Sequence, residues 1–226
     1  MRLLRLMAGD IRFQWKYGFY SVYAVFTAVY LMTLAAVTES ARRVVATVMI
    51  YSDPAAMGLF FMGAIILLEK SQRVDCALAT TPIRTLEYLT AKLISLAVIS
   101  LIVGAILAVA GGVQNLPLCL AAILLASVFC SACGLIAAER SQSLNRFVLW
   151  SMLIELILCL PALLLFGIEN PWLMLHPGVA AVWVIHGGAP STALCLLSLA
   201  AWCVAALWLG DRSVKRYFAE SGGAAL

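Results

Sequence analysis

Charged side chains are scarce in this sequence. Lys, Arg, Asp and Glu make up 12% of its 226 residues, whereas soluble domains carry roughly 25%, and the mean hydropathy is +1.03. Several apolar runs reach the length of about 20 residues that an α-helix needs to cross a bilayer. No run alternates apolar and polar residues over about ten positions, as membrane β-strands do. The composition therefore predicts an all-α polytopic membrane protein.

Catalytic motifs are absent as well. The sequence holds no G-x-x-x-x-G-K-[ST] phosphate loop, no H-E-x-x-H metal pair and no G-x-S-x-G nucleophile. Its two histidines, His176 and His186, have no acidic cluster beside them, and the acids are scattered along the chain. We therefore expect no catalytic residue, no metal site and no cofactor bound by this chain, with an intramembrane enzyme as a minor alternative.

Six apolar segments take up more than half of the chain. They leave no room for a folded soluble domain, so residues 1–226 are expected to form a single transmembrane domain. The second segment begins either at Val44 or at Pro54, where Ser52 or Asp53 is placed to cap a new helix; a kink at this position is the alternative. The expected spans are 20–37, 44–68 or 54–68, 93–109, 116–138, 147–166 and 192–209.

The basic residues are distributed unevenly about these spans. One side would hold 13 of the 15 Lys and Arg residues, and the other side only Arg42 and Arg43. Because Lys and Arg in short loops mark the cytoplasmic side, both termini and the loop between the second and third spans are predicted to be cytoplasmic. The net charge of +4 then reflects orientation in the membrane, and no nucleic acid is expected as a partner.

Residues 1–18 have two faces at helical spacing. Arg2, Arg5, Arg12 and Lys16 lie roughly opposite an apolar stripe formed by Leu3, Leu4, Met7, Ile11 and Trp15. A helix of this kind rests in the membrane interface and contacts lipid. The pattern predicts an amphipathic interfacial helix, with a mere topology signal as the alternative.

Residues 69–92 carry a concentration of charge between two segments that have almost none. Val74 and Leu78 give the first part a small apolar face, and Thr81-Pro82 then interrupts the helix, because the residue before proline disfavours helical backbone. We expect a short amphipathic helix, a break, and a helix that re-enters the membrane. The charged residues are Glu69, Lys70, Arg73, Asp75, Arg84, Glu87 and Lys92.

Two further features lie later in the chain. Residues 167–191 are too apolar for an exposed loop, yet prolines interrupt them, which predicts short helices re-entering the outer leaflet. Glu155 lies near the middle of the fifth span, where a carboxylate is costly. It is a candidate for the substrate path, with a hydrogen-bonded packing role or a subunit contact as alternatives.

In their order, these features resemble the permease subunits of type-2 ATP-binding-cassette exporters. The most specific match lies in residues 69–93, where E-K, a short helix, T-P and E-Y-L-x-x-K-L follow one another as in that family's passage from second to third span. Asn170-Pro171 through His176-Pro177 is similar to the family's N-P-x-x-x-L-x-P. The likeness is greatest to the small permeases that export fluoroquinolones, and it covers nearly the whole chain.

The resemblance implies a permease that forms half of a substrate path and is driven by a separate ATPase. Two ATPase subunits, which bind ATP and Mg, and a second permease, identical or related, would complete the exporter in the cell inner membrane. The substrate would be a lipophilic drug, a lipid or a peptide. The coupling loop would dock on the ATPase through Glu69, Lys70, Arg73, Val74, Asp75, Leu78, Thr81 and Pro82.

Two functions from other classes stay open. An ion-coupled secondary transporter would use Glu155, although no inverted repeat is visible in the sequence. A non-transporting membrane scaffold would also lack catalytic residues. Such a scaffold would bind an ATPase, as an exporter does, but the ATP hydrolysis of that ATPase would not be linked to transport.

Overall fold

The computed structural model describes residues 2–74, 84–141, 143–164 and 170–221. Within these ranges the chain is helical and contains no strand, so the predicted all-α class is confirmed. Five of the described helices are long and apolar enough to cross a membrane, and they match five of the six expected spans. They are α2 (Phe19–Ala36), α6 (Thr85–Ala110), α7 (Leu116–Glu139), α8 (Leu144–Leu164) and α10 (Thr192–Ser221).

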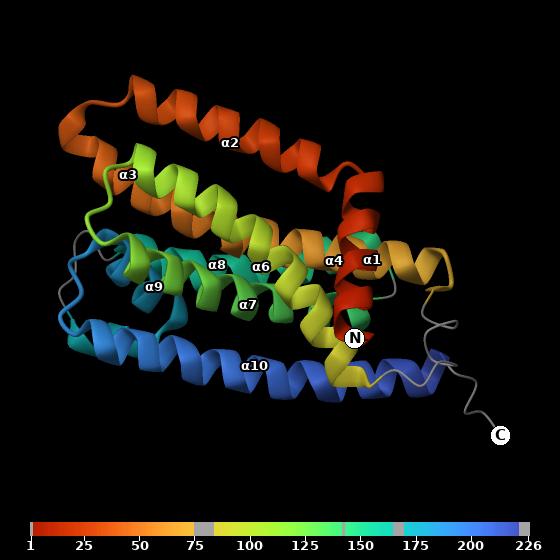
Figure 1. Ribbon diagram of the computed structural model, residues 1–226. Helices are drawn as coiled ribbons and strands as arrows, with labels where there is room; N and C mark the ends of the chain where they lie inside the picture. Colours follow the sequence, from red (N-terminus) through yellow and green to blue (C-terminus); the bar gives the residue numbers. More distant parts are fainter. Residues whose placement is uncertain (1, 75–83, 142, 165–169, 222–226) are drawn as a thin grey trace.

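The second expected span consists of three consecutive helical pieces (Figure 1). These are α3 (Glu39–Ser52), the π-helix η1 (Asp53–Gly58) and α4 (Leu59–Ser71). No single piece has the length of a span, but together they run for about 50 Å at about 1.5 Å per residue. A sixth crossing stays a prediction, which this unbroken course supports.

The expected helix cap at Ser52 or Asp53 is wrong. The Ser52 hydroxyl donates back to the Met49 carbonyl oxygen at 2.9 Å, and the backbone of Asp53 is right-handed helical. Pro54 lacks an N–H and its ring crowds the preceding turn of an α-helix. The chain passes this position as a wider π-helix, so the helix continues, with a local irregularity, where a new start or a kink was expected.

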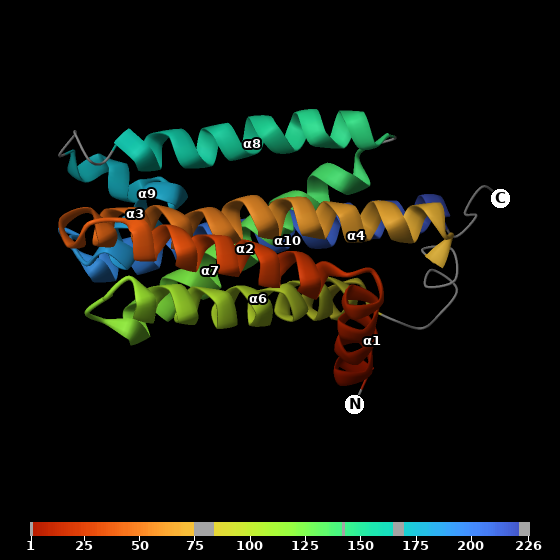
Figure 2. The ribbon, with the colours of Figure 1, turned by 90° about the horizontal axis from the view of Figure 1, so that it is seen from above.

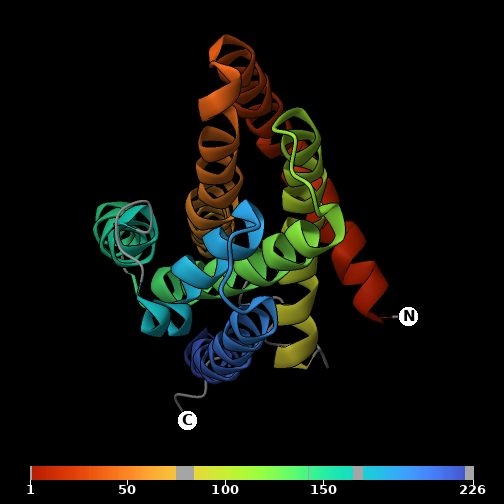
Figure 3. The ribbon, with the colours of Figure 1, turned by 90° about the vertical axis from the view of Figure 1, so that its left-hand side faces the viewer.

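Helix α7 lies in the middle of the bundle, whereas α2 and α8 lie at its edges (Figures 2 and 3). The buried share is 56% for α6 and 61% for α7, but 17% for both α2 and α8. Helix α7 packs against α4, α6 and α10. The two peripheral helices therefore present wide apolar faces to their surroundings, as expected of helices in a membrane.

Two glycines permit close helix contacts around α4. A Cβ atom on Gly134 of α7 would lie 2.2 Å from the backbone oxygen of Leu59, and one on Gly63 of α4 would lie 1.9 Å from the ring of Phe147. Small residues of this kind let membrane helices approach one another without a gap. They fix α7 against α4, and α8 against α4.

The bundle has two different ends (Figure 1). Helix α1 (Arg2–Lys16) lies across one end, against the start of α6. The 3₁₀-helix η2 (Pro171–Leu175) and α9 (Pro177–His186) lie at the other end. His176 caps α9, since its Nδ1 accepts a hydrogen bond from the Val179 N–H at 3.4 Å. Entry of this segment into the outer leaflet stays a prediction.

Candidate functional site

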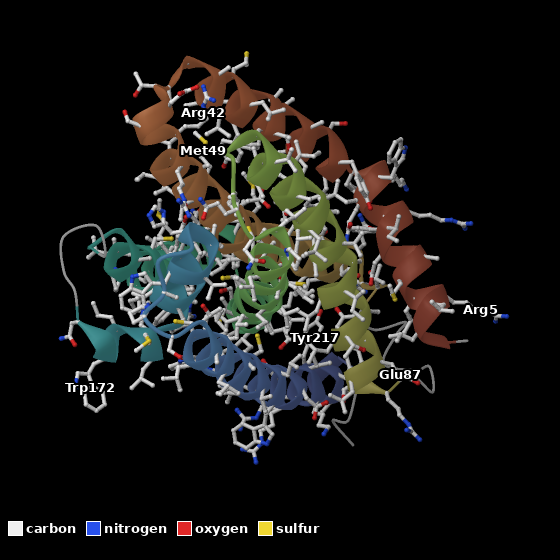
Figure 4. All side chains as sticks on the ribbon, turned by 60° about the vertical axis from the view of Figure 1, so that its left-hand side comes forward. Arg5, Arg42, Met49, Glu87, Trp172 and Tyr217 are labelled. Carbon is white, nitrogen blue, oxygen red and sulfur yellow. The ribbon has the colours of Figure 1, made fainter. Side chains whose placement is uncertain are left out.

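Helix α1 has an outer face that carries both classes of residue expected of an interfacial helix. Leu4 and Trp15 are exposed, as are the predicted basic residues Arg5, Arg12 and Lys16. Arg5 lies on the side of α1 away from the bundle (Figure 4), and Arg2 is the first residue of the helix. These side chains are available for lipid and headgroups, while the remaining face of α1 turns toward α6.

That inner face supplies one member of a buried ionic cluster, formed by Asp10, Glu69, Tyr88 and Lys92. The Lys92 Nζ lies 2.5 Å from Glu69 Oε1 and 3.0 Å from Asp10 Oδ1. The Tyr88 hydroxyl donates to Glu69 Oε2 at 2.7 Å, and the Lys92 ammonium lies 4.8 Å from the centre of the Tyr88 ring. Lys92 is only 2% exposed. The cluster therefore joins α1, α4 and α6 through groups that are mostly buried, with Asp10 the most exposed at 15%.

The charges of the cluster compensate one another incompletely. One ammonium group faces two carboxylates. Burial raises the pKa of Asp10 above its ordinary value, and Lys92 acts in the opposite direction by favouring the charged form. Because Lys92 is the cation that both carboxylates share, the arrangement depends on it.

A second bond supports the contact between α1 and α6. The Gln14 side-chain N–H donates to the Ser95 hydroxyl at 2.9 Å, and both residues are buried. Gln14 is one turn after Asp10, and Ser95 is one turn after Lys92. The two helices are thus held at two successive turns.

Lys70 points to the other side of α4. Its Nζ donates to the carbonyl oxygens of Ala138 at 2.9 Å and Glu139 at 2.7 Å, at the end of α7. It also lies 5.0 Å from the ring of Tyr217 in α10. A cation at the carboxyl end of a helix satisfies its last carbonyls and complements its dipole. Glu69 and Lys70 are consecutive in the chain, yet Glu69 connects α4 to α6 and Lys70 connects it to α7.

Two further predicted coupling residues, Arg73 and Val74, lie at the exit of α4. Arg73 is exposed and has a φ of 54°, the one positive φ outside glycine in the described ranges. Such backbone is uncommon for a residue with a side chain and marks a sharp change of direction. Val74 lines a hollow of about 220 Å³ between α1 and the cluster. The remaining four, Asp75, Leu78, Thr81 and Pro82, lie outside the described residues.

Glu155 lies in the peripheral helix α8 and is partly buried. Over the described parts of the chain its carboxylate has no hydrogen-bond or ion-pair partner, and its nearest titratable neighbours are Tyr51, Cys130 and Cys159. It lies apart from the Lys92 cluster, and its role in a substrate path stays a prediction.

Metal ligation finds no support in the part of the chain that is described. No three His, Cys, Asp or Glu side chains come together there. His176 caps α9, and the His186 Nδ1 lies 3.2 Å from the Thr47 hydroxyl oxygen. Both histidines therefore have structural partners.

Sequence reasoning missed Asp10 and Gln14. The signal was present as an acid and an amide four residues apart, on a helix otherwise made of apolar and basic residues. Such a pair lies on one helix face and indicates a third, inward face. The quoted motif E-K…E-Y-L-x-x-K-L did contain Glu69, Tyr88 and Lys92, which the structure brings into contact.

Comparison with known proteins assigns the chain to a family. The model of the Fluoroquinolones export permease protein family matches residues 1–211. The chain is also similar to the fluoroquinolones export permease proteins of two Mycobacterium tuberculosis strains, CDC 1551 / Oshkosh and H37Rv. Each is 33% identical over 160 residues, which cover 68% of this chain and 67% of the relative. The chain therefore belongs to the Fluoroquinolones export permease protein family and is a multi-pass permease of the exporter type.

Proposed function

We propose that this chain is the transmembrane subunit of an ATP-binding-cassette exporter in the cell inner membrane, driven by a separate ATPase that docks on the segment between α4 and α6. The observation that carries the proposal is the Lys92 cluster. It ties together α1, α4 and α6 at the root of the charged loop. An exporter of this kind needs such a junction, because movement imposed on a short loop has to reach the membrane helices.

The cluster would act as a rigid connection. Glu69 lies near the end of α4 and Lys92 near the start of α6, so their pairing holds the two ends of the loop together. Separating them leaves buried charges without partners, which is strongly unfavourable. A push on the loop is therefore transmitted to both helices, and Asp10 carries α1 with them.

Lys70 would pass the same movement to the rest of the bundle. Its bonds to the end of α7 and its contact with Tyr217 of α10 link α4 to the helices on the far side. Glu69 and Lys70 thus serve as connections within the subunit. The surface offered to an ATPase is the exposed Arg73 with the residues that follow it.

The composition of the exporter follows from the resemblance and from the named relatives. The names of the relatives specify fluoroquinolones, so an aromatic, lipophilic drug of that class is the proposed substrate, with lipids and peptides as alternatives. A second permease, identical or related, would complete the path, and two ATPases would each hold ATP and Mg. The wide apolar faces of α2 and α8 provide surface for lipid and for the second permease.

The first experiment tests for the ATPase. The chain is tagged at its C-terminus, purified in mild detergent from its own membranes, and its partners are identified by mass spectrometry. We expect an ATPase with a phosphate-binding loop, which is lost from the double variant Arg73→Ala/Asp75→Ala. Lys215→Ala, an exposed change in α10, is the matched control and should retain it. Absence of any ATPase from the wild-type sample would contradict the proposal.

A transport assay separates the rival functions. Inverted vesicles containing the complex should take up a fluorescent fluoroquinolone when ATP is added, and the Arg73→Ala/Asp75→Ala variant should not. Uptake that needs an ion gradient instead of ATP, and is abolished by Glu155→Gln, would favour a secondary transporter. An ATPase that binds but whose turnover responds to no fluoroquinolone, lipid or peptide would favour a scaffold.

A further inference from the structure

Asp53 lies deep in the bundle and has no part in the function proposed above. It begins η1, about 20 Å from the start of α3 and about 27 Å from the end of α4 at about 1.5 Å per residue. It is fully buried, with an exposed fraction of 0%. Helices α3, α6, α7 and α8 pack against η1. The carboxyl group is therefore enclosed by protein at membrane depth.

The Asp53 carboxyl group has no partner in the described part of the chain. Neither of its oxygens accepts a hydrogen bond there, and no Lys or Arg forms an ion pair with it. Glu69, by contrast, is buried beside Lys92 and Tyr88. An ionised carboxylate without a partner is among the costliest groups to place in an apolar interior. The site is consequently built for the neutral acid.

Hydroxyl groups surround this part of the chain. Tyr23 of α2 lies near both Asp53 and Ser100 of α6, and the Ser131 hydroxyl of α7 lies 3.0 Å from the position that a Cβ on Gly58 of η1 would take. All three side chains are buried. We call Tyr23, Ser100 and Ser131 the η1 hydroxyl cluster.

The titratable groups that face η1 are all uncharged or distant. Tyr23 and Tyr30 of α2 interact with Asp53. From α3, Tyr51 turns instead to the Leu158 carbonyl oxygen, to which its hydroxyl donates at 3.2 Å. Cys130 of α7 and Glu155 of α8 lie near Tyr51, and Ser100 of α6 lies near Tyr23. No positive charge compensates a negative one at Asp53.

We propose that Asp53 is an intramembrane proton-binding site, a neutral carboxylic acid in this conformation that exchanges its proton through the η1 hydroxyl cluster. The reaction is a simple protonation, in which a carboxylate and a proton from water form the acid. The protonated group gains an O–H donor, and each hydroxyl of the cluster can both donate and accept. Single π-helical turns within α-helices occur frequently at functional sites.

A proton fits this site better than a larger cation. A metal ion needs several oxygen or nitrogen ligands, and Asp53 belongs to no group of three metal-ligating side chains in the described ranges. An amine cation needs space beside the carboxylate, whereas Asp53 is fully enclosed. A proton needs no cavity beside the carboxyl group, so the tight packing around Asp53 favours a proton over a metal ion or an amine.

Infrared spectroscopy of the purified chain in nanodiscs tests the proposal without any partner protein. A protonated carboxylic acid has a carbonyl-stretch band that a carboxylate lacks. We expect such a band in the wild type and its absence from Asp53→Asn, which keeps the shape of the neutral acid. The band should convert reversibly to a carboxylate signal as the pH is raised. Glu155→Gln is the matched control and should leave the Asp53 band in place.

Each remaining outcome decides against the proposal. If no protonated-acid band distinguishes the wild type from Asp53→Asn, the group is ionised. A band that persists until the protein unfolds at alkaline pH would mean a fixed acid that exchanges no proton. Should Asp53→Asn fail to fold, Tyr23→Phe replaces it. Removal of that neighbouring hydroxyl should shift the band, and an unchanged spectrum would overturn the assignment. None of these results depends on whether an ATPase binds, so the proton site at Asp53 and the ATPase-driven export are tested independently.

Discussion

Lys92 shows how a single residue can determine the arrangement of three helices. Its ammonium group lies between Glu69 and Asp10 and over the ring of Tyr88, with almost no exposure to solvent. Moving such a group out of water is costly, and its partners repay that cost only if all of them are in place. The main effect of the cluster is therefore to fix the positions of α1, α4 and α6 relative to one another.

Replacement of Lys92 by Met should destabilise the protein strongly. The change preserves most of the side-chain volume but leaves two buried carboxylates side by side, and breaking a buried pair in this way costs about 3–5 kcal/mol. Thermal unfolding in detergent, followed by circular dichroism, measures the loss. The control Lys215→Met removes a cation that is 61% exposed and paired with Asp211, and its effect should stay within about 0.5 kcal/mol.

The double variant Lys92→Met/Glu69→Gln sharpens this prediction. Removing the Glu69 charge relieves the unpaired carboxylate, so the double variant should be less destabilised than the sum of the two single changes. Strict additivity of the two changes, or a Lys92→Met variant as stable as the wild type, would show that the cluster does not hold the helices together.

Among the secondary-structure elements, α7 has the most contacts along its length. It lies against α4, α6 and α10, and its carboxyl end receives Lys70. The approach to α4 depends on Gly134, where a Cβ would lie 2.2 Å from the Leu59 oxygen and 2.9 Å from the Leu59 carbonyl carbon. Backbone atoms cannot turn aside as a flexible side chain can, so α7 and α4 would have to separate.

The variant Gly134→Ala should therefore be destabilised although alanine favours helices. Insertion of a methyl group into a filled site costs about 1–3 kcal/mol, against a gain of about 1 kcal/mol in helix propensity. Gly9→Ala in α1 is the matched control, because no atom lies within 4 Å of its added Cβ. Detergent unfolding should show a lower midpoint for Gly134→Ala and an equal or higher midpoint for Gly9→Ala. The reverse order would contradict the packing of α7 on α4.

The elements that the sequence predicts well are those with long apolar runs. The expected spans 20–37 and 116–138 agree with α2 and α7 to within one residue at each end, because the bilayer sets the length of such runs. The sixth expected span ends at 209, and the helix that contains it, α10, continues to Ser221. Its charged last turns resemble a loop in sequence, whereas the bond from the Thr85 hydroxyl to Asp211 at 2.6 Å ties them to α6.

Two parts of the candidate sites depend on packing that no local pattern reveals. Ser52, Asp53 and Pro54 have the residue types of a helix start, yet contacts with α7 and α6 keep the chain helical through them. Asp10 and Gln14 are ordinary polar residues until α6 supplies Lys92 and Ser95. Partners more than eighty positions apart in the chain are beyond the reach of spacing and propensity.

At the scale of the whole molecule, the two ends of the bundle differ in charge and in kind (Figure 1). The end with α1 and the Lys92 cluster also holds Lys70, Arg73 and the last turns of α10. The other end holds η2 and α9, from which Trp172 points away from the bundle, 78% exposed (Figure 4). This asymmetry agrees with the bias of basic residues, and it orients the molecule if Lys and Arg lie on the cytoplasmic side.

The predicted orientation can be measured by cysteine labelling in intact cells. Glu39→Cys, at the exposed start of α3, should react with a membrane-impermeant maleimide added outside, because it lies at the end predicted to be external. Arg216→Cys, exposed on α10, should react only after the cells are permeabilised. Both variants need Cys76→Ser to remove the thiol in the charged loop, and the six described cysteines, all buried or partly buried, serve as the internal background.

Labelling of Arg216→Cys in intact cells would place α1, the Lys92 cluster and the loop after α4 outside. An ATPase could not then reach them, so this result would contradict the proposed coupling together with the orientation.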